Sequence, residues 1–198
     1  LASFPELKEV PRAGIVHRLD KNTSGVLAVA RSLTAQVQLV KQLKDRSMNR
    51  QYFALVYGRP SAEGTIDAPM DRHRLQRTKM AVVYAGKPAV TYYRLVSTTA
   101  HCALLDVKLE TGRTHQIRVH MTHAGHPLIG DTVYRQGRPG LGRATAEAQV
   151  LIEGFPRQAL HAYRLGLVHP VTGNQLDFEA QIPADLIELI EKLERVDV

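Results

Sequence analysis

The sequence has one cysteine, no tryptophan and no apolar run long enough to cross a bilayer. The single cysteine, Cys102, excludes an intramolecular disulfide and is typical of a reducing compartment. The lack of a long apolar run argues against a membrane-spanning helix, and no secretory signal is visible. We therefore expect a cytoplasmic protein with no membrane partner.

Acidic residues are also scarce. The chain has 19 Asp and Glu against 26 Lys and Arg, which gives a formal net charge of +7. Several arginines cluster in expected loops instead of alternating with acids along helices, and this favours a polyanionic partner. Because no basic amphipathic helix of the membrane-surface type is present, we expect nucleic acid as that partner.

The 198 residues are enough for one domain with a substantial core, and no internal repeat or linker divides them. We expect an extended segment over 1–13 and a surface loop, with at most a short helix, over 135–156. The expected helices are 33–45, with a buried stripe of Leu33, Val37, Val40 and Leu43, then 115–124 and a terminal helix after Pro183. The expected strands are 51–57, 65–68, two within 80–98, 105–110, 159–168 and 175–180. This pattern predicts an α+β fold with a mixed, mostly antiparallel β-sheet core and flanking helices.

Asp20 lies in a short polar loop between two β-prone segments, 15–16 and 26–30, which we expect to lie side by side in the sheet. A carboxylate on a loop held by rigid flanks is well placed to act on a ligand at the sheet edge. The alternative is a turn aspartate capped by neighbouring hydroxyls. Arg18, two residues earlier, favours the functional interpretation.

Two arginines flank the start of the expected helix over 115–124. Arg113 is unfavourable there for the helix dipole, so we expect another reason for its presence. Arg118 follows one turn later. Either these groups hold a phosphate or the carboxylate of Asp20, or they form a solvated basic helix; we favour the first interpretation.

Histidines are frequent in the same region and suggest a metal site. They are His115, His120, His123 and His126, with Asp131 nearby. However, the first two are five residues apart and diverge on a helix, and neither a His-Glu-x-x-His pattern nor a cysteine partner is present. We therefore predict no metal ion and expect the histidines to bond backbone or phosphate groups.

Two further features could contact nucleic acid. Tyr52, in the expected strand 51–57, is either a core residue or a ring that stacks on a flipped base. The segment 71–79 contains the cations Arg72, Arg74, Arg77 and Lys79 and should project from the sheet. It either contacts an RNA backbone or is a solvated loop.

Four stretches together resemble the RluA family of pseudouridine synthases. They are residues 17–25 (HRLDKNTSG), 51–56 (QYFALV), 112–120 (GRTHQIRVH) and 158–162 (QALHA). They follow the order and spacing of that family and extend over nearly the whole chain. The resemblance implies that residues 1–198 form the catalytic domain, without the N-terminal S4-type RNA-binding domain that many members carry.

The resemblance also implies roles for individual residues. Asp20 is expected to be the catalytic aspartate, Tyr52 to stack on the target base, and Arg118 to pair with Asp20. The expected substrate-binding residues are Arg18, Leu160, Arg113, His115, Arg72, Arg74 and Arg77. Of these, Leu160 lines the pocket and Arg18 fills the gap left by the flipped nucleotide.

The function expected from the resemblance is conversion of specific uridines in large-subunit ribosomal RNA to pseudouridine. The reaction rearranges one nucleotide without adding or removing atoms, so we expect no cofactor. The expected partner is 23S-type rRNA, in a stem-loop, and we expect a monomer. The alternatives are the same chemistry on tRNA and a non-catalytic RNA-binding factor of ribosome assembly.

Overall fold

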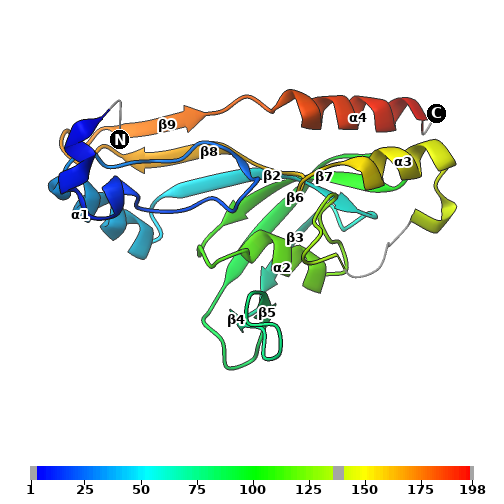
Figure 1. Cartoon of the computed structure of the whole chain (residues 1–198), viewed down its shortest axis with the longest axis horizontal. Helices are drawn as coiled ribbons and strands as arrows, with labels where there is room; N and C mark the ends of the chain where they lie inside the picture. The colour runs from blue at the N-terminus through cyan, green and yellow to red at the C-terminus, as the bar shows by residue number, and fades with distance from the viewer. Residues whose placement is uncertain (1–3, 136–140, 197–198) are drawn as a thin grey trace.

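The computed structural model describes residues 4–135 and 141–196, and its centre is a seven-stranded sheet (Figure 1). The strands are β1 (Ser24–Gly25), β2 (Asn49–Tyr57), β3 (Glu63–Asp67), β6 (Val90–Thr98), β7 (Cys102–Leu109), β8 (Leu160–Val168) and β9 (Gln175–Glu179). Their order is β1-β8-β2-β7-β6-β3, and β9 also pairs with β8. Only β1 and β8 run parallel, so the predicted mixed, mostly antiparallel α+β fold is confirmed.

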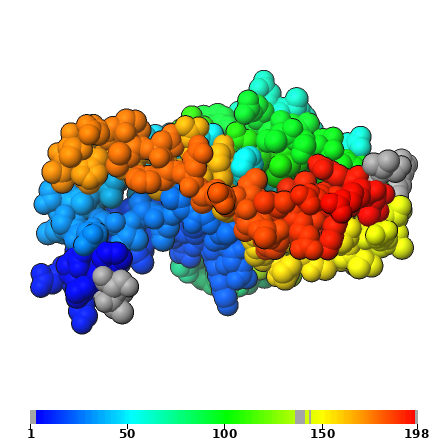
Figure 2. All heavy atoms as spheres, turned by 90° about the horizontal axis from the view of Figure 1, so that it is seen from above, coloured from blue at the N-terminus to red at the C-terminus, as the bar shows by residue number. Residues whose placement is uncertain are grey.

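Helices cover both faces of this sheet because β2 is apolar on both. Tyr52, Ala54 and Val56 face the core under α2 (Gln116–His123). Leu55 and Tyr57 face a second core under α3 (Ala146–Gly154) and α4 (Ala184–Val196). Figure 2 shows β9 and α4 following one another along one side of the molecule.

The N-terminal part differs most from expectation. Residues 5–14 form two short 3₁₀ turns, Pro5–Glu9 and Pro11–Gly14, where an extended segment was predicted. The segments that flank Asp20 meet in a single bridge, Ile15 to Val29, and only β1 joins the sheet. Prolines 5 and 11 start these turns, since a fixed φ suits a first helical position.

The helix α1 (Leu33–Lys44) forms where predicted, with the Ser32 hydroxyl accepting from the amide of Ala35 at 3.2 Å. Its predicted buried stripe is wrong, because Leu33 and Val37 are exposed and Leu39 is the buried residue. The helix packs on β8 through Leu39. Its apolar face therefore points partly to solvent and partly to the cavity described below.

A second, small hairpin stands apart from the sheet. It consists of β4 (Met70–Arg72) and β5 (Met80–Val82), and Figure 1 shows it projecting below α2. Residues 135–156, expected to be mainly loop, contain the 3₁₀ turn Leu141–Arg143 and α3, while 136–140 lie outside the described residues. No helix in the described part of the chain is long and apolar enough to span a bilayer.

Candidate active site

The loop that carries Asp20 is fixed to the start of β8. Ser24 pairs with His161 in the sheet, and its hydroxyl also bonds Nδ1 of that histidine at 2.9 Å. Gly25 lies so close to the backbone of Ala162 that a Cβ would overlap it. The glycine therefore allows the loop to lie directly against the strand.

The hydroxyls near Asp20 do not cap its carboxylate. Nε2 of Gln158 donates to the carbonyl of Lys21 at 2.6 Å and to the hydroxyl of Thr23 at 3.0 Å, while Ser24 bonds β8. The turn-capping alternative is thus not what the structure contains, and the Asp20 side chain is left to face the cavity.

Arg118 connects Asp20 to a second carboxylate. Its Nη1 donates to Oδ2 of Asp20 at 3.2 Å, while Nε and Nη2 bond both oxygens of Asp131 at 2.6 and 3.0 Å. Burial would raise the pKa of Asp131, but Arg118 and the amides of Val133 and Tyr134 lower it below its usual range. The pairing with Asp20 agrees with the prediction, whereas the stronger fork to Asp131 was not predicted.

Tyr134 extends this cluster to His115. The Tyr134 hydroxyl accepts from the amide of Met80 at 2.8 Å and lies 2.6 Å from Nδ1 of His115. A Tyr134 proton directed at Nδ1 would place the proton of the neutral histidine on Nε2. Nε2 lies 3.9 Å from Oδ1 of Asp20. Burial lowers the pKa of His115, so the ring is neutral at pH 7.

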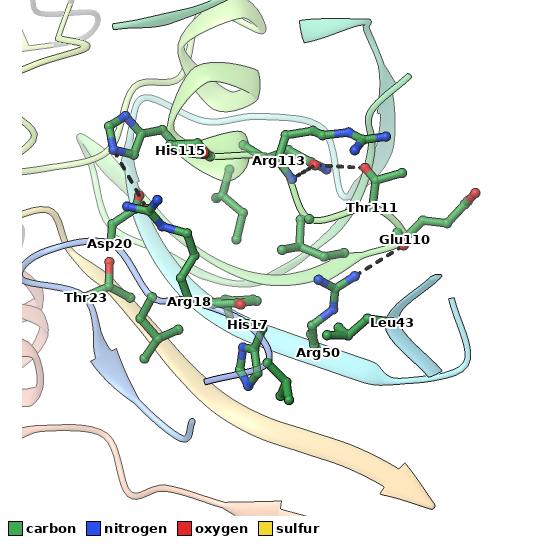
Figure 3. A pocket seen from close by; sticks show the side chains of 18 of the residues that line it. His17, Arg18, Asp20, Thr23, Leu43, Arg50, Glu110, Thr111, Arg113 and His115 are labelled. Carbon is green, nitrogen blue, oxygen red and sulfur yellow. Dashed lines mark hydrogen bonds and ion pairs between the residues drawn. The ribbon is translucent and has the colours of Figure 1, made fainter. Parts of the chain in front are cut away.

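A cavity of about 570 Å³ opens in front of this cluster (Figure 3). Asp20 and Arg18, from one stretch of the sequence, line it together with Tyr52 and Leu160, which come from two distant ones. Burial raises the pKa of Tyr52, with opposing and reinforcing effects from the charges of Arg50 and Asp20, so its phenol is neutral. A neutral ring, an aliphatic side chain and a carboxylate around one space can hold a planar base against a reactive group.

The other predicted substrate-binding residues fall into two groups. His115 and Arg113 line the cavity, and Nε of Arg113 donates to the carbonyl of Pro88 at 3.1 Å. Three do not line it: Arg72, Arg74 and Arg77 lie on the β4–β5 hairpin with exposed side chains. Any contact they make with a ligand is therefore outside the cavity.

The histidines of the α2 region serve separate purposes. His120 is buried, with its ring nitrogens 2.9 Å from the Thr91 hydroxyl and 3.0 Å from the Ala68 carbonyl. Nδ1 of His126 bonds the carbonyl of Tyr57 at 2.9 Å. Among the described residues, no group of three or more His, Cys, Asp and Glu is arranged to hold a metal ion.

Sequence reasoning gave no role to four residues of the site. Asp131 and Tyr134 fix Arg118 and His115, while Arg50 and His17 line the far end of the cavity. The sequence contained one chemical indication for Asp131. If Arg118 is buried and uses one N–H on Asp20, its other N–H groups need a second acceptor. Asp131 was the next carboxylate along the chain.

Comparisons with known proteins agree with this geometry. The family model for RNA pseudouridylate synthase matches residues 2–123. "Ribosomal large subunit pseudouridine synthase D" of Vibrio parahaemolyticus is 48% identical over 196 residues, which are 98% of this chain and 60% of the relative. The protein of the same name from Escherichia coli K12 is 50% identical over 189 residues, 95% of this chain and 58% of the relative.

Two solved human structures share the fold. The structure of RNA pseudouridylate synthase domain containing 4 superposes with a TM-score of 0.72 at 26% identity, over 90% of this chain and 75% of that one. The structure of domain containing 1 gives 0.69 at 26% identity, over 85% and 69%. The chain spans about three fifths of the length of the curated relatives that it matches. On its sequence, its fold and its motifs, the chain belongs to the RluA-type RNA pseudouridylate synthase family.

Proposed function

We propose that this chain is the catalytic domain of an enzyme that converts uridines of large-subunit ribosomal RNA to pseudouridine. The observation that carries the proposal is Asp20, a nearly buried carboxylate that is held by Arg118 and faces a cavity lined by Tyr52. Family membership and the names of the bacterial relatives support the reaction and the substrate. In this proposal residues 1–198 form one catalytic domain, and an S4-type RNA-binding domain belongs to the rest of the protein.

The reaction breaks the N1–C1′ bond of the uridine, turns the uracil and joins its C5 to C1′. The proton on C5 is then lost to solvent and N1 takes one up. Asp20 is the catalytic residue, acting on the base, on C1′ or on a sugar proton. A buried carboxylate is costly unless it is paired, and Arg118 supplies the opposite charge at 3.2 Å. Because Arg118 is itself anchored by Asp131, it can hold Asp20 in one place while the uracil turns.

Tyr52 and Leu160 hold the base during that turn. Both are buried in the wall of the cavity, so an inserted uracil would find a phenol ring and an aliphatic side chain. The target uridine must leave its stack, which costs on the order of a few kcal/mol and less in a loop. Arg18, an exposed residue of the cavity lining, fills the gap that the nucleotide leaves. A stem-loop of 23S-type rRNA is therefore a suitable substrate.

The isomerisation leaves the composition of the nucleotide unchanged, because the proton lost from C5 is balanced by one gained at N1, and it requires no oxidant, reductant or energy donor. We therefore propose that it proceeds without a cofactor, in a monomer that acts in the cytoplasm. The Arg113 and His115 side chains contribute to substrate binding at the cavity, and Arg72, Arg74 and Arg77 contribute outside it.

The test of the reaction compares Asp20→Asn with Asp177→Asn, which removes an exposed carboxylate paired with Arg164 in the sheet. Tritium release from RNA labelled at uridine C5 should be abolished by the first change and unaffected by the second. RNA binding should be retained in both, because Asp20→Asn removes a negative charge near phosphates. Release that persists in Asp20→Asn would rule out Asp20 as the catalytic residue.

Two other functions are distinguished by mapping. Pseudouridine mapping of rRNA and tRNA from cells with and without the gene should show sites that disappear only from large-subunit rRNA. Loss of sites from tRNA alone would favour the tRNA alternative. Unchanged maps, together with RNA binding, would favour a non-catalytic assembly factor.

A further inference from the structure

Arg50 is a buried guanidinium for which the described residues provide no carboxylate. Its side chain lies in the cavity wall at 7% exposure, and its Nη2 donates to the backbone carbonyl of Glu110 at 3.3 Å. Its Nε has no hydrogen-bond partner in the described structure. The carboxylate of Glu110 turns away and bonds Arg46 and the Tyr92 hydroxyl instead. Arg50 therefore lies in the cavity wall with one buried donor unpartnered and no carboxylate to balance its charge.

A charge in this position is unfavourable in the empty protein. Burial lowers the pKa of Arg50, although an arginine remains protonated at pH 7. The guanidinium nevertheless has a fitted space. A Cβ at position 112 would overlap Nη1 of Arg50, and the residue at that position is Gly112. A buried cation that lacks a partner but has a fitted space is expected where an anion arrives from outside.

The position of Arg50 relative to Tyr52 identifies where that anion would lie. The two residues are two apart in β2 and point to the same face, so their Cα atoms are about 7 Å apart. Figure 3 shows Asp20 and His115 at one end of the cavity and Arg50 at the other. An anion bound at Arg50 would thus lie about one nucleotide along a nucleic-acid strand from a base that contacts Tyr52.

His17 adds a second donor beside Arg50. Its Nε2 accepts from the amide of Ala28 at 3.0 Å, so the proton of the neutral ring is on Nδ1. Burial, and then the charge of Arg50, lower the pKa of His17 to about 4, which keeps the ring neutral. Arg12 and Lys44 also line the cavity, as do Arg46 and Glu110, which are paired with each other. Together these groups favour an anion strongly over a cation.

We propose that Arg50, with His17 beside it, binds a backbone phosphate that flanks the uridine held between Asp20 and Tyr52. This inference rests on the proposed function for the identity of the phosphate as part of RNA. The guanidinium fork suits a phosphate oxygen pair better than a point charge would. Binding there fixes the nucleotide next to the target and so the depth to which the uracil enters the cavity.

The first experiment requires no RNA. Arg50→Met removes an unpaired buried charge, so it should raise the melting temperature in phosphate-free buffer. Added inorganic phosphate should raise the melting temperature of the unchanged protein, since a ligand of the folded state stabilises it, and should raise that of Arg50→Met less. Arg195→Met, which changes an exposed arginine of α4, should respond like the unchanged protein. Equal phosphate responses in all three proteins would overturn the proposal.

The second experiment uses RNA stem-loops with one neutral methylphosphonate at successive positions around the target uridine. At one flanking position the substitution should weaken binding to the unchanged protein about 10- to 100-fold, the range of one charge-assisted hydrogen bond. The same substitution should weaken binding to Arg50→Met no further. If the losses of affinity from the methylphosphonate and from Arg50→Met multiply at every position, Arg50 contacts none of these phosphates, which would contradict the proposal.

The two proposals can fail separately. An unchanged protein that forms no pseudouridine in any RNA contradicts the proposed function, while the phosphate-dependent melting still decides whether Arg50 binds an anion. If the enzyme is active but the methylphosphonate weakens binding to Arg50→Met as much as to the unchanged protein, the proposed function stands and the phosphate subsite is wrong.

Discussion

The cavity and the β4–β5 hairpin are both rich in arginine, but the two regions differ in whether the charged groups are buried or exposed. At the cavity, Arg118 is buried and shared between two carboxylates, and Arg50 is buried without one. On the hairpin, the side chains of Arg72, Arg74 and Arg77 are exposed. Buried charges interact strongly and hold one geometry, whereas exposed charges are weakened by water and salt. We therefore expect the Asp20–Arg118 pair to control turnover and the hairpin to contribute to affinity without affecting turnover.

The largest effect on turnover after loss of Asp20 itself should come from Arg118→Ala. Removing one member of a buried ion pair costs about 3–5 kcal/mol of stability, so the variant must first be shown to be folded. Arg118→Lys keeps a charge but cannot serve both Asp20 and Asp131, and it should also lose turnover. Single-turnover rates measure both effects.

The matched control is Arg113→Ala, which removes an arginine from the same cavity wall but only a bond to a backbone carbonyl. It should leave the saturated rate far less changed than Arg118→Ala does. Equal losses in the two variants would mean that proximity to the cavity, and not the pairing with Asp20, determines the effect.

The cavity should also add a pH dependence to stability. The folded-state pKa of His17 is about 4, depressed from 6.5 first by burial and then by Arg50. The unfolded chain therefore takes up this proton first as the pH falls, and stability present above pH 6.5 is lost progressively down to about pH 4. The loss is at most about 3 kcal/mol. Denaturant unfolding of the unchanged protein and of His17→Gln across this range measures it.

His123→Gln, which changes an exposed histidine at the end of α2, is the control for that measurement. It should keep the pH dependence, whereas His17→Gln should reduce it; burial also lowers the pKa values of His115, His120 and His161, and these carry the remainder. Arg50→Met should raise the pKa of His17, because one of the two causes of its depression is removed. An unchanged slope in His17→Gln would show that other groups carry the acid sensitivity.

A smaller loss of turnover is expected from Tyr134→Phe. The change removes the acceptor of the Met80 amide and frees His115 to place its proton on either nitrogen. We expect a drop of about tenfold in the saturated rate, the effect of one hydrogen bond. The tautomer of His115, read from nitrogen chemical shifts, should become mixed. Tyr163→Phe, which removes a hydroxyl bonded to Asp106 away from the cavity, should change neither.

The sequence predicts the fold well where signals are local. Ser32 caps α1 and Gly125 follows the end of α2, as their residue types indicate. The orientation of α1 was not predictable in the same way. Its apolar stripe has a helical period, but the period does not say whether that face meets the sheet or a cavity, and here Leu39 meets the sheet.

For the site, the motif pattern predicted Asp20, Tyr52 and Leu160 at one cavity because the resemblance supplied their spatial relation. For residues to which the resemblance assigned no role, the sequence contained no information about spatial position. Asp131 was considered only as a metal ligand, and Arg50 was given no role. Their importance comes from burial and from missing or shared partners, which appear only once the chain is folded.

The smallest effect on the saturated rate is expected from the hairpin. Replacing Arg72, Arg74 and Arg77 with Gln should raise KM and leave kcat unchanged, because exposed backbone contacts serve substrate and transition state alike. Each lost phosphate contact should reduce the slope of log K against log salt by about 0.7–0.9. RNA binding across a salt series, together with single-turnover rates, measures both quantities.

A charge-matched variant decides whether the hairpin itself is responsible. Replacing Arg94, Lys192 and Arg195 with Gln removes three exposed cations elsewhere on the molecule. It should change the slope of log K against log salt much less. An unchanged slope in the hairpin variant would make 71–79 a solvated loop. A collapse of the saturated rate with binding intact would instead mean that the hairpin positions the uridine. The Met80 amide bonded to Tyr134 would then be the route from hairpin to cavity, and the separation of affinity from turnover would fail.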